Sequence, residues 1–292
     1  MRATLRPLLA VAVVVSAILT GHTDTALTAA IGRSAQPGVA SIQPARGAMV
    51  GVAHPVIVTF ADPVTDRPAA ERAIAVKSEP AMSGGYEWLD NRVVQWVPDR
   101  FWPAHSTVAL AVGSEHTEFK TGPKVLGVAD IENHTFTVSI DGVVAGPTPP
   151  LPAPHHRPHW GEDGVLPASM GRPEFATPVG TYRVLSKDRS VTMDSSSVGI
   201  PVDSPDGYRL KVDYAVRITD RGLFVHSAPW AESSIGVENT SHGCISLAPT
   251  DAEWYYDTVS VGDPVVVTQG VPFSRSDKQV GPKLQTPERP PS

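Results

Sequence analysis

The chain is poor in cysteine, in long apolar runs and in clustered basic residues. Cys244 is the one cysteine among 292 residues, so the chain cannot form an internal disulfide. The formal net charge is −6 and no basic run occurs, which argues against a nucleic-acid-binding protein. Apolar residues make up 41% of the chain and charged residues 18%, a globular composition. The length is sufficient for two folded domains of ordinary size.

The longest apolar run lies at the N-terminus, from Leu8 to Leu19. Arg2 and Arg6 precede it and small residues follow, which is the pattern of a secretory signal. The run is shorter than the roughly 20 residues of a membrane-spanning helix. We expect a signal peptide over residues 1–30 and a linker over residues 31–40. The alternative, an uncleaved signal-anchor, is the one membrane contact that the sequence predicts. Either way, the protein is expected in a periplasm-like space or the cell wall.

In an exported protein, a single cysteine such as Cys244 calls for an explanation. Exported proteins that use cysteine structurally carry it in even numbers, whereas a leftover cysteine indicates a reactive thiol or a bridge between molecules. The simpler interpretation is a small buried apolar residue, which is the commonest role of a free cysteine. The residue types near Cys244 are needed to distinguish between these interpretations.

Proline (29) and glycine (24) are abundant, which favours short strands joined by turns. Over residues 41–122, apolar residues alternate with polar ones, for example at Val56, Val58 and Phe60. This period of two predicts an antiparallel immunoglobulin-like β-sandwich.

A second β-rich unit is expected over residues 123–270. Phe136, Val138 and Ile140 alternate with polar residues as in a half-buried strand, and further short strands follow. Residues 271–292 are expected to form a flexible, Pro-rich tail. The fold class is therefore mainly β, with a sandwich followed by a β-rich second domain.

One short helix is expected after Cys244, in the stretch PTDAEWYYDTV. Thr250 and Glu253 have the spacing of a capping box, in which each side chain satisfies a backbone amide at the helix start. Apolar residues then recur at helical spacing.

A Pro- and His-rich insertion covers residues 147–164 and cannot form a regular element. We interpret it as a solvated surface segment. The alternative is a metal site formed by five of its side chains: His155, His156, His159, Glu162 and Asp163. We expect no metal and no cofactor.

His226 and Cys244 are candidates for a nucleophilic site. His226 ends an alternating strand, and an imidazole next to a thiol is a common way to remove the thiol proton. Gly243 permits a sharp turn that leaves backbone amides open to an oxyanion. A zinc site built from His226, His242 and Cys244 is a weaker alternative, because it has no clear fourth ligand.

The stretches FVHSAPW and SHGC resemble the signature of the L,D-transpeptidases, bacterial cell-wall enzymes with a YkuD-type catalytic domain. The similarity covers about residues 125–268 and is greatest to the mycobacterial-type branch. That branch carries bacterial immunoglobulin-like domains before the catalytic one, in agreement with the sandwich expected over residues 41–122.

The resemblance implies an exported enzyme that forms 3→3 cross-links in peptidoglycan. Cys244 would attack the carbonyl between the third and fourth residues of a tetrapeptide stem and release the terminal D-alanine. His226 would be the base, first for the thiol and then for the acceptor amine. The backbone carbonyl of Ser227 would orient the imidazole. β-Lactams of the carbapenem class are implied as inhibitors.

The resemblance also implies an oxyanion hole formed by the amides of His242, Gly243 and Cys244. Tyr208 lies on a segment that forms a lid in the family, and its hydroxyl would assist the oxyanion or the substrate. Met193 and the neighbouring stretch DSSSVG, residues 194–199, would belong to the same lid. Arg221 and Gly222 fall where the family contacts the stem peptide.

The chain departs from the family pattern at Ser246, where the family usually has asparagine. Serine is shorter and lacks the paired donor and acceptor of an amide. We therefore expect an effect on substrate positioning, with the nucleophile and base intact.

Three alternatives differ in testable ways. An L,D-carboxypeptidase would form the same acyl-enzyme and resolve it with water. A catalytically weak wall-binding module is favoured only by Ser246. Papain-like and sortase-like proteases fit less well, and papain-like enzymes need a histidine downstream of the cysteine, whereas His226 precedes Cys244.

Overall fold

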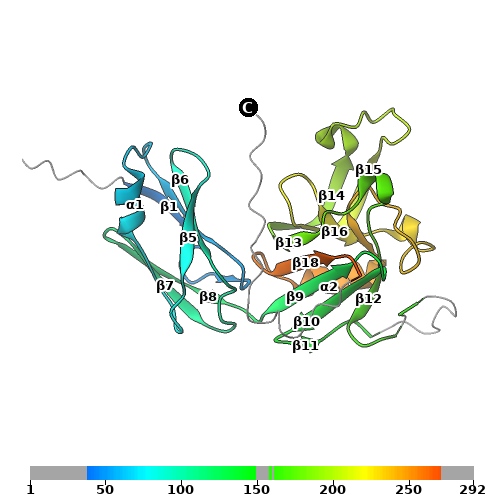
Figure 1. Ribbon diagram of the computed structural model, residues 1–292, viewed down its shortest axis with the longest axis horizontal. Coiled ribbons are helices and arrows are strands. Elements are labelled where there is room, and N and C mark those ends of the chain that lie inside the picture. Colours follow the sequence, from blue (N-terminus) through cyan, green and yellow to red (C-terminus); the bar gives the residue numbers. More distant parts are fainter. Residues whose placement is uncertain (1–37, 149–157, 160, 271–292) are drawn as a thin grey trace, which may run out of the picture. The chain divides into compact units, whose positions relative to one another are not determined.

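The computed structural model describes residues 38–148, 158–159 and 161–270 (Figure 1). The predicted signal (1–30), residues 31–37 of the predicted linker and the predicted tail (271–292) lie outside the described residues. The described part is mainly β, as predicted, and comprises an immunoglobulin-like sandwich and a larger sheet. Within it, no helix is long and apolar enough to cross a membrane.

The N-terminal sandwich consists of two four-stranded sheets. The first has the order β1 (Val39–Gln43), β3 (Val56–Phe60), β6 (Val93–Pro98) and β5 (Gly84–Trp88). The second has the order β2 (Met49–Val50), β8 (Glu115–Thr121), β7 (Thr107–Val112) and β4 (Ile74–Lys77). Neighbouring strands are antiparallel, except that β2 and β8 are parallel.

The core of the sandwich follows the alternation in the sequence. Val58 of β3 and Leu110 of β7 belong to the two sheets and are buried in one cluster. The rings of Trp96 and Trp102 stack in the same cluster, with centroids 5.3 Å apart. Because every second residue of a strand faces this core, the period-two pattern was sufficient to predict the sandwich.

The sequence pattern missed one helix of the sandwich, α1 (Arg67–Ala73). Asp66 caps it by accepting a 3.0 Å hydrogen bond from the amide of Ala69. Seven residues are too few to establish a helical period, which explains the omission.

The second domain is built on a ten-stranded sheet. Its order is β13 (Gly180–Arg183), β18 (Pro264–Thr268), β9 (Val125–Asp130), β10 (Thr135–Ile140), β12 (Val165–Ser169), β17 (Ile245–Leu247), β16 (Phe224–Ser227), β15 (Arg209–Arg217) and β14 (Ser186–Asp194). The short β11 (Val143–Val144) pairs with β10. Figure 1 shows β9, β10 and β12 side by side.

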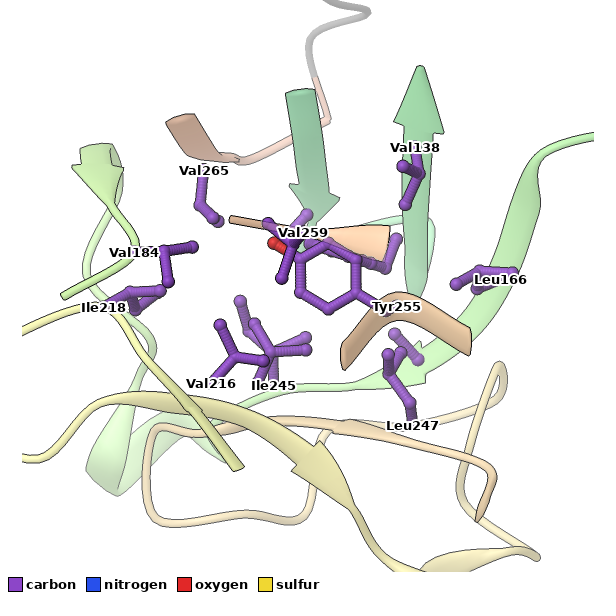
Figure 2. Close-up of a cluster of buried hydrophobic side chains, with 14 of the residues drawn as sticks. Val138, Leu166, Val184, Val216, Ile218, Ile245, Leu247, Tyr255, Val259 and Val265 are labelled. Atoms are coloured by element: carbon purple, nitrogen blue, oxygen red, sulfur yellow. The ribbon is translucent and has the colours of Figure 1, made fainter. Parts of the chain in front are cut away.

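The core of this domain is centred on Tyr255 of helix α2 (Pro249–Thr258) (Figure 2). Its ring meets Phe136 of β10 edge to face, with centroids 4.8 Å apart. Ile245 and Leu247 of β17 are fully buried in the same cluster. The strand that follows the candidate nucleophile is therefore anchored on both of these side chains.

Helix α2 confirms the expected helix, but the predicted capping box is wrong. Ala248 is the N-cap and no side chain caps the helix. Pro249 is the first helical residue, and proline favours extended backbone at the residue before it, as Ala248 shows with ψ 152°. Thr250 therefore lies inside the helix and cannot serve as its cap.

Strands β16 and β17 run parallel at the centre of the site described below. Their register places His226 opposite Ser246 and Ser227 opposite Leu247. On the other side of β17, Ser246 pairs with Ser169 of β12. The pairing thus fixes the ends of β12, β16 and β17 next to one another.

Three 3-10 helices complete the described elements. They are η1 (Pro173–Phe175), η2 (Ser195–Val198) and η3 (Pro229–Ala231). The first two lie in segments that reach the candidate site.

Candidate active site

His226 lies on β16 with its side chain buried. Its Nδ1 lies 2.8 Å from the carbonyl oxygen of Ser227, so Nδ1 carries the proton and donates it. The lone pair of Nε2 is then free to accept a proton. Burial lowers the pKa of His226, an effect that the hydrogen bond to Ser227 opposes in part. The imidazole is therefore neutral at pH 7, as a base has to be.

Cys244 directly precedes β17, and its side chain is half-buried. The sulfur packs against a small apolar cluster that includes Phe224 and Met193. Burial raises the pKa of the Cys244 thiol to about 11, although Arg217 and the backbone of Phe224 favour the thiolate. The thiol donates to the carbonyl oxygen of Gly222, with Sγ and oxygen 3.7 Å apart. Cys244 is thus a neutral thiol that needs a base to react.

The backbone before Cys244 is held in a turn. Gly243 has φ +119°, a conformation that side chains disfavour. The hydroxyl of Ser241 accepts from the amide of Gly243 at 3.1 Å and donates to the carbonyl of Cys244 at 2.6 Å. These contacts fix the orientation of the amides that precede the thiol.

A loop at residues 170–177 supports this turn. The Thr177 hydroxyl donates to the carbonyl of Gly243 at 2.7 Å and accepts from the amide of Gly171 at 2.9 Å. Arg172 and Ser241 are joined by a backbone hydrogen bond of 3.0 Å. Sequence reasoning missed Thr177, because a single threonine in a Gly- and Pro-punctuated segment carries no specific signal.

His242 lies among aromatic side chains. Its ring centroid is 4.7 Å from that of Phe175 and 4.9 Å from that of Tyr208. Partial burial lowers the pKa of His242, and the positive charge of Arg172 lowers it further. A zinc site of His226, His242 and Cys244 is not supported, because none of the described residues forms a group arranged to hold a metal ion.

Tyr208 ends the loop that joins β14 to β15, residues 195–208. The backbone amide of Ser195 donates to the carbonyl of Tyr208, and the amide of Tyr208 donates to the Ser195 hydroxyl, both at 3.0 Å. The pKa of Tyr208 is raised by burial first and by Cys244 and Asp194 next. The hydroxyl is therefore protonated and can donate a hydrogen bond.

Met193 and Gly222 also lie at the thiol. Met193 of β14 packs on the same apolar cluster as Cys244. Gly222 has φ +90° and places its carbonyl on the thiol. Arg221 lies in the same turn and is exposed. Arg217, which sequence reasoning missed, lies over the ring of Phe224 at 4.5 Å.

Ser246 is buried on β17, where it pairs across the strands with His226 of β16 and with Ser169 of β12. The hydroxyls of Ser169 and Thr240 are 3.2 Å apart. The position where the family pattern has asparagine therefore lies between Ser169 on one side and His226 on the other.

The insertion is described only in part. His155 and His156 lie outside the described residues. Nδ1 of His159 lies 3.0 Å from a carboxylate oxygen of Glu162, and both side chains are partly exposed. This local contact is typical of a surface turn.

Comparison with known proteins agrees with this geometry. Residues 129–267 match the YkuD L,D-transpeptidase catalytic domain, and residues 20–117 match a bacterial Ig domain. The chain is 66% identical to probable L,D-transpeptidase 3 of Mycobacterium tuberculosis over 272 residues, which cover 92% of this chain and all of the relative. It is 46% identical to L,D-transpeptidase 1 of the same organism over 260 residues, which cover 89% and 96%.

Solved structures give the same result. The crystal structure of M. tuberculosis L,D-transpeptidase 3 matches with a TM-score of 0.74 and 73% identity, covering 79% of this chain and 98% of that one. A second structure of that enzyme holds a faropenem-derived adduct. The structure of L,D-transpeptidase LdtMt1 in complex with imipenem matches with a TM-score of 0.71 and 48% identity, covering 80% and 99%.

Proposed function

Because the chain belongs to the L,D-transpeptidase family, we propose that Cys244 and His226 are the nucleophile and base of its peptidoglycan cross-linking reaction. The observation that carries this proposal is the orientation of His226. Its Nδ1 proton is held by the Ser227 carbonyl, so Nε2 is available to a thiol that burial keeps protonated. Ser227 acts here through its backbone and not through its hydroxyl.

Acylation begins when Sγ of Cys244 attacks the carbonyl carbon between the third and fourth residues of the donor tetrapeptide. Nε2 of His226 takes the thiol proton as the carbon–sulfur bond forms. The carbonyl oxygen becomes an oxyanion, which the amides of His242 and Cys244 stabilise. The Gly243 amide, expected from the family to join them, donates to the Ser241 hydroxyl instead. When the carbon–nitrogen bond breaks, the imidazolium returns the proton to the departing amine of D-alanine, and a thioester remains.

Deacylation completes the 3→3 cross-link. The side-chain amine of an acceptor stem attacks the thioester, and His226 removes the proton from the attacking nitrogen. The new amide forms as the carbon–sulfur bond breaks, and the proton returns to the thiolate. If water attacks instead, the product is a free tripeptide and the enzyme acts as an L,D-carboxypeptidase.

Five further residues are proposed to bind the substrate or the oxyanion. The Tyr208 hydroxyl is neutral and would donate a hydrogen bond to the oxyanion or the substrate. Gly222 places its backbone carbonyl next to the thiol. Met193 supplies an apolar contact at the thiol. Arg221 and Ser246 are assigned to the stem peptide.

Carbapenem-class β-lactams are proposed as inhibitors that acylate Cys244. Structures of relatives contain imipenem or a faropenem-derived adduct, which supports the extension to this chain. A β-lactam carbonyl would take the place of the scissile carbonyl, and the opened ring would stay bound as a thioester.

The cellular setting is also part of the proposal. The family acts on the cell wall, and we infer that the chain is exported through residues 1–30. We further propose a linker, a sandwich that extends to residue 122 and a catalytic domain over residues 123–270. The sandwich begins with β1 at Val39, so residues 39 and 40 of the expected linker belong to the sandwich.

Intact-mass spectrometry with a disaccharide-tetrapeptide donor tests the proposal. We expect a thioester on the wild-type chain and none on Cys244→Ala. Addition of an acceptor stem should convert the adduct to a 3→3 dimer, whereas tripeptide alone would identify a carboxypeptidase. Absence of any adduct, dimer or tripeptide would leave the wall-binding module as the better interpretation.

A further inference from the structure

Arg172 is a cation that the mechanism above does not use. Its side chain is 25% exposed and makes four contacts beside the turn that precedes Cys244. Nη2 donates to a carboxylate oxygen of Asp206 at 2.5 Å, and Nε lies 3.6 Å from Glu174. Nη1 lies 3.3 Å from Nε2 of His242, and the guanidinium carbon lies 4.5 Å from the centre of the Phe175 ring.

The backbone of Arg172 belongs to the same framework as the nucleophile. Its amide donates to the carbonyl of Ser241, and Gly171 and Ser241 form a parallel bridge. A side chain on Gly171 would meet the backbone of Phe175 and Gly243, so this approach is close and fixed. The backbone of Arg172 is therefore fixed relative to the turn before Cys244, and its guanidinium extends from there to His242 and to Asp206 of the loop at residues 195–208.

Asp206, by contrast, belongs to the loop at residues 195–208. Its side chain is 52% exposed, and its contact with Arg172 bridges residues that lie 34 positions apart in the sequence. Ion pairs that are this exposed contribute little to stability, so another carboxylate can replace Asp206 at small cost. A planar guanidinium binds any carboxylate with the same fork of donors.

The donor peptide carries a carboxylate at the required place. If the proposed function holds, the leaving D-alanine ends in a free carboxylate one residue beyond the scissile carbonyl. Adjacent Cα atoms are about 3.8 Å apart, so this carboxylate lies close to the thiol during acylation. A cation fixed beside the turn before Cys244 is suited to recognise it.

We propose that Arg172 binds the terminal carboxylate of the donor stem and that Asp206 occupies this position before substrate arrives. The inference rests on the proposed function and adds a specificity-determining residue to it. Arg172 selects donors that end in a free carboxylate, and Asp206 competes with them.

The test compares two donors that differ only at this carboxylate. One is the tetrapeptide with a free terminal carboxylate, and the other carries a terminal carboxamide. Both yield the same thioester. The intrinsic difference between the two departing amines is the same for every variant, so a change in the ratio of the acylation kcat/KM values between variants reports recognition of the carboxylate. The ratio is measured within one enzyme preparation and does not depend on the fraction of folded protein.

We expect the wild-type chain to prefer the free carboxylate by about tenfold to a hundredfold, the usual range for one charge-assisted hydrogen bond. Arg172→Gln should reduce this preference to near unity, and Arg172→Lys should retain part of it. Asp206→Asn should lower the KM of the carboxylate donor by about two- to fivefold, because it removes a competitor of modest strength. Glu174→Gln, at the longer contact, is the matched control and should change neither quantity.

Two results would overturn the inference. A preference that persists in Arg172→Gln would show that another group binds the carboxylate. Equal impairment of both donors in Arg172→Gln and Asp206→Asn would show that the pair only fastens the loop to the site. If the wild-type chain forms no thioester with either donor, the proposed function itself fails, whereas a thioester without donor preference contradicts this inference alone.

Discussion

The hydroxyl of Thr177 donates a 2.7 Å hydrogen bond to the carbonyl of Gly243, the residue immediately before the nucleophile. The same oxygen accepts from the amide of Gly171, and the threonine is almost fully buried. One side chain thus connects the loop at residues 170–177 to the turn that orients the oxyanion amides. This connection makes Thr177 a positioning residue, which acts on the reaction through Gly243.

Replacing Thr177 with valine keeps the shape and removes both hydrogen bonds. The buried amide of Gly171 and the carbonyl of Gly243 then lose a partner, so we expect unfolding free energy to fall by about 1–3 kcal/mol. We also expect the rate of acylation by a carbapenem to fall about 10- to 100-fold, because small displacements of catalytic groups are costly. Chemical denaturation and stopped-flow acylation measure the two effects.

Thr181→Val is the control for this prediction. Thr181 is a buried threonine on β13, outside the loop at residues 170–177. The substitution Thr181→Val should leave the rate of acylation by a carbapenem close to that of the wild-type chain. If Thr177→Val acylates as fast as Thr181→Val, the hydrogen bond to Gly243 has no part in positioning the oxyanion amides.

The pH dependence of acylation follows from the protonation states of His226 and Cys244 in the free enzyme. Burial lowers the pKa of His226, so the imidazole is a neutral base at pH 7, while burial raises the pKa of Cys244 to about 11. The rate should therefore rise at acidic pH as His226 loses its proton and stay level from about pH 7 to about pH 9. A continuous rise through about pH 8.5, the pKa of an unperturbed thiol, would show that a free thiolate reacts without the base.

Sequence patterns were sufficient for the fold because each domain depends on local alternation. Val58 and Leu110 show it in the sandwich, and Phe136 shows it in the catalytic domain. The roles of His226 and Cys244 stay a prediction: their residue types permit nucleophilic chemistry, and the resemblance to the L,D-transpeptidases favours it over a buried, unreactive thiol.

Sequence patterns did not reveal Thr177 and Arg172, which support the turn before Cys244, and the reason is topological. Thr177 and Gly243 are 66 positions apart, and Arg172 and His242 are 70 positions apart. They meet because β12 pairs with β17, a register that single-strand alternation does not reveal. The capping box failed for a local reason, because Pro249 starts the helix one residue earlier than Thr250.

Asp263 makes the stability of the chain depend on pH. Burial raises the pKa of Asp263 to about 7, although the amide of Ser260 donates to it at 2.7 Å and Lys187 lies near. The folded state therefore holds a proton that the unfolded state releases near pH 4. Unfolding free energy should consequently fall as pH rises from about 4 to about 7.

Asp263→Asn should remove this dependence. The variant should gain stability relative to wild type as pH rises, by at most about 4 kcal/mol at pH 7 and above. Urea denaturation at a series of pH values measures the difference, with Asp257→Asn, an exposed residue of α2, as the control. Parallel stability curves for wild type and Asp263→Asn would mean that Asp263 does not titrate in this range.

Ser246→Asn tests the departure from the family pattern. An asparagine amide presents a donor and an acceptor in the row of His226, so we expect it to hold the acceptor stem better than the serine hydroxyl. The fraction of thioester that ends as 3→3 dimer should rise, and the fraction that ends as tripeptide should fall. Because Ser246 is buried, the larger side chain is expected to cost about 1–3 kcal/mol of stability.

Chromatography of the two products, at equal amounts of thioester, separates partitioning from the rate of acylation. Ser169→Asn, the partner of Ser246 across β12 and β17, is the matched control for added bulk in the same row. It should cost similar stability without shifting the products toward the dimer. An unchanged dimer fraction in Ser246→Asn would mean that this position does not select between amine and water, and the serine would then be neutral for the reaction.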